Sequence, residues 1–160
     1  ARTAWLDSGI RDFPLAATYS YNLVNHEEGI DNGESDPPTA ISAHITSSEF
    51  DLQDGDRFGF IRRVLPDMTF LGSTADSPGA VMTFYPLKNS GSGYTTPASE
   101  GGNSTGTITR SVAAPVEAYT DQVNVRVRGR QMAIKIESTS AGVQWQLGSP
   151  RIDIRADGQR

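Results

Sequence analysis

The sequence lacks cysteine, long apolar runs and any clustering of histidine. Without cysteine there is no disulfide framework, no thiolate zinc site and no cysteine nucleophile. No window of 18 apolar residues occurs, so we expect no membrane span. The two histidines, His26 and His44, do not stand at a metal-binding spacing such as H-x-H or H-x-x-x-H. We therefore predict no metal, no cofactor, no small-molecule substrate and no enzymatic activity.

Helical periodicity is also missing. No segment of ten or more residues carries the apolar stripe of an amphipathic helix. Short segments instead alternate apolar and polar residues with a period of two, the pattern of half-buried strands. The predicted strands before the last forty residues are 19–24, 41–50, 57–65, 69–71, 81–87 and 107–112. Asp54-Gly55 is predicted to be a hairpin turn, followed by a strand in which Phe58, Phe60 and Val64 supply core.

The last forty residues show the clearest alternation. Four segments between 122 and 155 are separated by turn signals at Gly129, at 138–142 and at 148–150. This spacing predicts an antiparallel sheet of hairpin-connected strands with one apolar face. The predicted core residues are Val125, Ile134, Ile136, Trp145, Leu147 and Ile152.

These segments predict an all-β fold. Nine or ten strands without a helix or an internal repeat favour an antiparallel β-sandwich with long loops, and part of a β-propeller is the alternative. A length of 160 residues suits one domain spanning 1–160. Residues 88–105, rich in Gly, Ser and Thr, are predicted to form a flexible loop with Tyr94 as a candidate contact residue. Because the chain begins with Ala1 rather than Met, we expect an excerpt of a longer polypeptide.

Charge is unevenly distributed along the chain. Residues 1–56 hold eleven acidic residues and two arginines, a net charge of −9, whereas residues 110–160 hold eight basic and five acidic residues, a net charge of +3. The two regions are expected to attract each other within a chain or between copies.

The basic residues form a row on predicted strands. The candidate subunit-interface residues are Arg126, Arg128, Arg130, Arg151 and Arg155, with Lys135 on an adjoining strand. Pairing with Asp or Glu on a solvated or subunit-facing sheet is the preferred interpretation, and specific nucleic-acid binding is a weaker alternative.

Two acidic segments contain residue types that occur in metal or acid/base sites. His26-Glu27-Glu28 lies in a stretch with glycines and twin prolines, so an exposed loop is favoured over a metal or acid/base site. Residues 51–56 lack the D-x-D-x-D-G pattern of a calcium loop, so a turn is favoured there.

Several motifs resemble the C-terminal part of large structural proteins of short-tailed bacteriophages. The resemblance rests on the following segments: 26–31 (HEEGID), 50–56 (FDLQDGD), 63–67 (RVLPD), 126–133 (RVRGRQMA) and 142–160 (GVQWQLGSPRIDIRADGQR). The family comprises tail tube, hub or nozzle components. The resemblance implies a C-terminal domain of a longer subunit, which would account for the missing initiator methionine.

The resemblance also implies a function in assembly rather than turnover. Copies of the chain would form a ring, commonly of six subunits, together with other tail proteins in the virion, after synthesis in the bacterial cytoplasm. Genomic DNA would only pass through the ring, and an acidic chain suits a lumen that must not hold phosphates. A carbohydrate-binding sandwich with aromatic platforms among Trp5, Tyr19, Tyr21 and Tyr94 is the second hypothesis. A hydrolase with its acids in 26–56 is the third.

Overall fold

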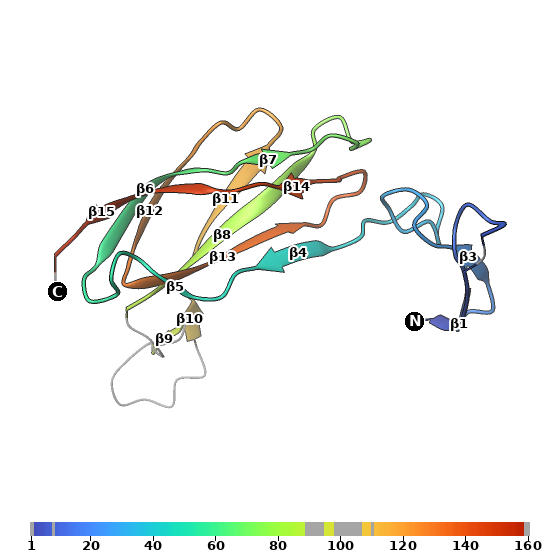
Figure 1. Ribbon diagram of the computed structural model, residues 1–160, viewed down its shortest axis with the longest axis horizontal. Coiled ribbons are helices and arrows are strands. Elements are labelled where there is room, and N and C mark those ends of the chain that lie inside the picture. Colours follow the sequence, from blue (N-terminus) through green and yellow to red (C-terminus); the bar gives the residue numbers. More distant parts are fainter. Residues whose placement is uncertain (1, 8, 89–94, 98–106, 110, 159–160) are drawn as a thin grey trace.

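The protein is all-β, as predicted. The structure, a computed structural model, describes residues 2–7, 9–88, 95–97, 107–109 and 111–158, and no helix occurs among them. Figure 1 shows the strands, which are β1 (Arg2–Leu6), β2 (Leu15–Thr18), β3 (Leu23–Asn25), β4 (Ala43–Thr46), β5 (Phe50–Asp51), β6 (Gly59–Leu65), β7 (Met68–Thr69), β8 (Gly79–Leu87), β9 (Thr95–Pro97), β10 (Thr107–Thr109), β11 (Val112–Glu117), β12 (Val123–Gly129), β13 (Gln131–Ser138), β14 (Gln146–Leu147) and β15 (Arg151–Ala156). The described part of the chain thus holds more strand segments than the nine or ten predicted, because several are only two or three residues long.

Two antiparallel sheets form the body of the molecule. The larger sheet has the strand order β11-β8-β13-β4, with β5 also paired to β13, and the smaller sheet has the order β12-β6-β15. Pro115 is tolerated in β11 because this strand lies at a sheet edge, where a missing N–H breaks no inner ladder. Neither sheet follows the consecutive strand order of a meander.

The two sheets share one core. Buried side chains from the larger sheet, such as Met82 and Phe84 on β8, pack in one cluster with Ile61 of β6 and Val125 of β12 from the smaller sheet. In the alternating strand β12 every second residue is buried, as the sequence predicts. The arrangement is therefore sandwich-like, with the apolar faces of two sheets turned toward each other.

The six core residues predicted in the last forty residues all belong to this cluster or pack against it, as does Val64, whereas Phe58 and Phe60, also predicted to supply core, do not. Val125 and Ile136 are buried, with 5% and 2% of their surface exposed. The remaining four are partly buried against the cluster: Ile134, Trp145, Leu147 and Ile152. The Trp145 indole N–H donates a hydrogen bond of 2.9 Å to the Ser138 hydroxyl, which satisfies its polar atom.

The predicted hairpin at Gly129 is wrong. Strands β12 and β13 are separated only by Arg130, yet β12 pairs with β6 while β13 pairs with β8, β4 and β5. The chain passes from one sheet to the other at this corner. The Arg130 N–H donates to the Leu87 carbonyl at 2.9 Å, and the Arg130 carbonyl accepts from the Leu52 N–H at 2.7 Å. Sheet-switching strands of this kind form the corners of packed sheets.

Four further expectations about turns and strands are also corrected. Asp54-Gly55 does not join a hairpin, because β4 and β5 pair with β13 whereas β6 pairs with β12 and β15. Strand β14 pairs with β7, and β15 pairs with β6, so 138–142 and 148–150 join no hairpin either. The segment 19–24, predicted as one strand, contains a turn between β2 and β3 in which Tyr21 has a φ of 64°.

The described residues between 2 and 42 form an arm that projects from the body. Strands β1, β2 and β3 make a separate antiparallel sheet, which Figure 1 shows at the far end of the molecule from the C-terminus. None of the arm's residues belongs to the shared core. We refer to residues 2–42 as the N-terminal arm and to residues 26–38 within it as the acidic loop.

Most of the predicted loop 88–105, including Tyr94, lies outside the described residues. The exceptions are Lys88 and β9, which pairs with β10. Among the described residues, no helix has the length and apolar character of a membrane span.

Candidate interaction surfaces

The outer face of the smaller sheet carries a concentration of arginines. Each of its three strands contributes two exposed ones: Arg62 and Arg63 on β6, Arg126 and Arg128 on β12, and Arg151 and Arg155 on β15. We call these six residues the arginine face. Four of the five predicted interface residues, Arg126, Arg128, Arg151 and Arg155, are brought together here.

The sequence pattern does not assign Arg62 and Arg63 to this face, because these two consecutive residues interrupt the alternation of apolar and polar residues. Ile61 and Val64 are both buried, with two consecutive exposed residues between them. The pairing of β6 shifts register against both neighbours in this stretch, between Asn124 and Val127 on β12 and between Asp153 and Ile154 on β15. Such irregularities re-aim side chains, and here two arginines face outward.

A groove opens at the edge of this face, between β6 and β12, where their pairing shifts register, and the start of β11 in the larger sheet. It has a volume of about 730 Å³ and is lined by Phe60, Arg62, Val112, Asn124, Val125 and Arg126. Its apolar lining comes from Phe60 and two valines, and its cationic lining from two arginines. We call it the arginine groove.

Two arginines of the face are paired with aspartates. Arg63 lies 3.7 Å from the Asp153 carboxylate on the neighbouring strand. Arg128 forms an ion pair with Asp157, and its guanidinium lies 4.1 Å from the centre of the Phe58 ring. Phe58 was predicted to be core, but it is only partly buried and serves as a platform for this arginine.

The other predicted interface cations occupy different settings. Arg130 lies at the corner between the sheets, with its guanidinium 5.0 Å from the Phe58 ring. Lys135 belongs to β13 in the larger sheet, so the expectation that it adjoins the arginine row is wrong. Its ammonium contacts the Glu137 carboxylate at 2.5 Å, and this hydrogen bond raises the pKa of Lys135.

Four arginines of the face form no ion pair among the described residues: Arg62, Arg126, Arg151 and Arg155. Exposed guanidinium groups are well suited to partners that offer planar carboxylates or aromatic faces. The arginine face is therefore equipped to bind an acidic or aromatic partner.

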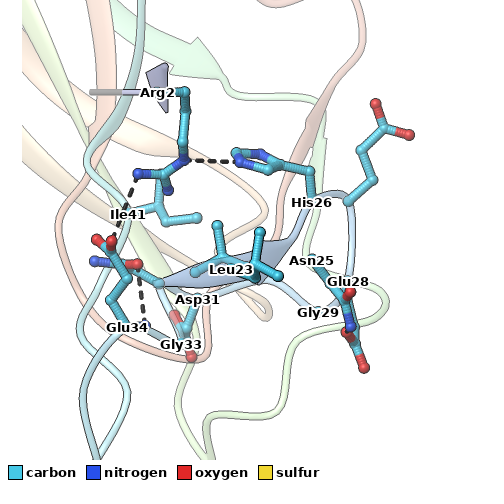
Figure 2. Close-up of a pocket in the computed structure, with 13 residues that line it drawn as sticks. Arg2, Leu23, Asn25, His26, Glu28, Gly29, Asp31, Gly33, Glu34 and Ile41 are labelled. Atoms are coloured by element: carbon cyan, nitrogen blue, oxygen red, sulfur yellow. Dashed lines mark hydrogen bonds and ion pairs between the residues drawn. The ribbon is translucent and has the colours of Figure 1, made fainter. Parts of the chain in front are cut away.

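A second candidate surface is a pocket of about 500 Å³ in the N-terminal arm (Figure 2). Arg2 lies between two partners: its Nε donates to His26 Nε2 at 2.8 Å, and its Nη1 lies 3.5 Å from the Glu34 carboxylate. The His26 ring packs against Trp5, with ring centroids 4.3 Å apart. His26 therefore has a structural part in the arm.

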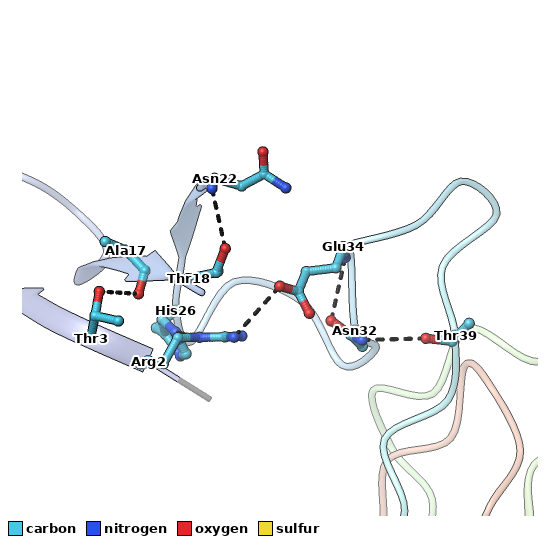
Figure 3. A network of polar contacts seen from close by, with 9 residues as sticks. All are labelled: Arg2, Thr3, Ala17, Thr18, Asn22, His26, Asn32, Glu34 and Thr39. Atoms are coloured by element: carbon cyan, nitrogen blue, oxygen red, sulfur yellow. Dashed lines mark hydrogen bonds and ion pairs between the residues drawn. The ribbon is translucent and has the colours of Figure 1, made fainter. Parts of the chain in front are cut away.

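Polar contacts also organise the acidic loop (Figure 3). The backbones of Asn32 and Thr39 exchange two hydrogen bonds of 2.8 and 3.0 Å, and the Asn32 side chain accepts from the Glu34 N–H at 3.3 Å. Asp31 points to the body, where both carboxylate oxygens accept from the Gly142 N–H at 2.9 and 2.8 Å. The loop is thus folded on itself and tethered to the sandwich.

The acidic segment 51–56 starts at the end of β5 and continues as a turn, which the sequence favours over a calcium loop. Its first carboxylate, Asp51, accepts a hydrogen bond of 2.8 Å from the Gln131 side chain, and Gly55 adopts a φ of 74° beside it. No group of three or more His, Cys, Asp or Glu side chains suited to a metal ion occurs among the residues that the structure describes.

Neither protein-family models nor curated protein sequences match this chain.

Proposed function

We propose that this chain is a structural β domain that works by self-assembly, as a component of a bacteriophage tail tube, hub or nozzle. The phage assignment rests on the sequence resemblance. The assembly role rests on one structural observation, the arginine face, which leaves four arginines without an acidic partner among the described residues. A surface of this kind is suited to recognising another protein surface.

The complementary charge is present on the same chain. Residues 26–56 hold nine acidic residues and no lysine or arginine. Figure 1 places the arm, with its acidic loop, toward the end of the molecule opposite the C-terminus, whereas β6, β12 and β15, which carry the arginine face, lie toward the C-terminal end. Contacts between two different surfaces of identical copies are heterologous, and they close into rings when the rotation between copies permits.

A ring built in this way supplies a conduit without any catalytic group. In the proposed tail, copies of this chain form a ring of six with other tail proteins, and genomic DNA passes through the centre during ejection. The overall charge of −5 disfavours retention of the phosphate backbone. The arginines do not oppose this passage, because they are proposed to be covered by protein.

We expect the chain to self-associate in a salt-dependent manner. Sedimentation velocity from about 10 μM to about 1 mM covers the affinity range of weak assembly contacts. Raising sodium chloride from about 0.1 to about 1 M shortens the Debye length from about 10 to about 3 Å, so we expect association to weaken by about tenfold or more. A chain that stays monomeric over the whole range at low salt would contradict the assembly role.

Carbohydrate binding is a second candidate, because the arm exposes aromatic rings. Trp5 is 60% exposed and packs on His26, which lines the pocket of the arm, while Tyr19 and Tyr21 are 68% and 100% exposed. Exposed rings can stack on the apolar faces of sugars. A glycan array separates the two functions: selective binding to one glycan class would favour the carbohydrate hypothesis, and a structural subunit is expected to bind none.

A further inference from the structure

We propose that the N-terminal arm of one copy docks into the arginine groove of a second copy. In this contact, apolar and aromatic side chains of the arm cover the groove's floor, and carboxylates of the acidic loop pair with Arg62 and Arg126. The inference rests on the proposed assembly function and names its interface.

The arm has the surface of a docking element. Leu6, Leu15 and Leu23 lie on one face of its sheet by register, and Leu6 and Leu23 are 54% and 76% exposed. Trp5 is also largely exposed, on the opposite face of the sheet, and Tyr19 is exposed in the turn after β2. The exposed leucines on one face give the arm an apolar surface that can serve as an interaction site. The shared core contains none of them, so the body of the same copy does not bury them.

The arginine groove has matching chemistry. Phe60 and Val112, both partly buried, offer apolar surface, Val125 of the core lies beneath it, and Arg62 and Arg126 flank it with positive charge. The arm carries its apolar side chains next to Glu27 and Glu28, which are exposed at the start of the acidic loop. An apolar centre with a charged rim on both partners is the common anatomy of a protein interface, in which aromatic residues and arginine are enriched.

The chain already combines guanidinium, ring and carboxylate within one copy. Arg128 stacks on Phe58 and pairs with Asp157. In the arm, Arg2 binds His26 and Glu34 together. Arg62 and Arg126 lack an acidic partner of this kind among the described residues. An arm that brings rings and carboxylates would complete the same combination for them.

Geometry assigns the occupant to a second copy. In Figure 1 the N-terminal sheet lies beyond β4, at the far end from the C-terminus, whereas the groove is on β6 and β12. The Asp31 carboxylate holds the acidic loop to Gly142 of the body, which keeps the arm extended away from its own groove. Two distinct surfaces at separate places on one chain give a head-to-tail contact.

The test uses two variants of the full chain that each disable one side of the contact. Arg62→Glu/Arg126→Glu reverses the charge of the groove and leaves the arm unchanged. Glu27→Lys/Glu28→Lys reverses the charge of the arm and leaves the groove unchanged. Each variant alone is expected to self-associate at least about 100-fold more weakly than the wild type, because like charges then face each other. An equimolar mixture is expected to regain association, because the native arm of one variant meets the native groove of the other and the two reversed surfaces again carry opposite charges.

Native mass spectrometry and sedimentation velocity distinguish the outcomes. Variants that assemble like the wild type, or singly monomeric variants that fail to pair when mixed, would overturn the docking contact and leave the assembly function standing. A monomeric wild type would remove the proposed function as well. Arg57→Glu/Lys88→Glu, which makes the same change of charge outside the groove, should assemble normally. Arg62→Gln/Arg126→Gln, which only neutralises the groove, should weaken assembly with unchanged thermal unfolding.

Discussion

Replacing Gly129 with alanine is expected to lower the free energy of unfolding by about 3 kcal/mol. A Cβ atom at this position would lie 2.9 Å from the carbonyl oxygens of both Gln131 and Leu87, and 3.2 Å from the Pro86 side chain. Both oxygens belong to the backbone of paired strands, so neither can move without disturbing a sheet. The substitution therefore strains the corner at which the chain leaves one sheet for the other.

A matched control separates this effect from the general consequence of adding a methyl group. Gly33 in the acidic loop has open space where its Cβ would lie, so Gly33→Ala should change stability by less than about 1 kcal/mol. Urea denaturation followed by tryptophan fluorescence measures both variants, with equal m-values required for the comparison. If Gly129→Ala unfolds like the wild type, the corner is not as tightly packed as its geometry indicates.

The corner also explains why the strands could be predicted but not their partners. A period of two predicts which side chains face the core, and this prediction is confirmed for Val123, Val125 and Val127. It carries no information about the neighbouring strand. A glycine between two alternating segments predicts a hairpin, yet Gly129 is required for close backbone approach at a change of sheet.

Part of the arginine face was predictable from the period-two alternation. Arg126, Arg128, Arg151 and Arg155 alternate with buried residues and face outward. Arg62 and Arg63 could not be assigned, because the register shift that turns both outward depends on pairing with two other strands. Lys135 was misplaced because its strand follows the corner into the other sheet.

The arm was the least predictable region. No strand is predicted before residue 19, yet Trp5 lies in β1, which pairs with β2 and whose Trp5 ring packs against His26. The exposed leucines of this sheet do not alternate with charged residues, so no amphipathic pattern identifies them. A sheet whose apolar residues stay exposed on its own copy shows a weaker alternation of apolar and polar residues than a sheet that packs on a core.

Replacing Phe84 with alanine is expected to lower the free energy of unfolding by about 3–5 kcal/mol. Phe84 is fully buried at the centre of β8, where it pairs with Val112 on one side and Ile134 on the other. Its ring contributes to a core that both sheets share. The cost comes from the lost apolar burial and from the cavity that remains when the surrounding side chains cannot fully collapse.

The same variant tests whether the two sheets form one cooperative unit. If they do, hydrogen exchange of β6 and β12 amides should accelerate as much as that of β8 and β13, although Phe84 is on β8 alone. Val81→Ala on the same strand is the control, because Val81 is 39% exposed on the opposite face and its truncation should cost less than about 1 kcal/mol. Faster exchange confined to the larger sheet would show that each sheet is stable alone. The arginine face would then lie on a separable layer, and the head-to-tail contact would have to hold that layer in place as well as join the copies.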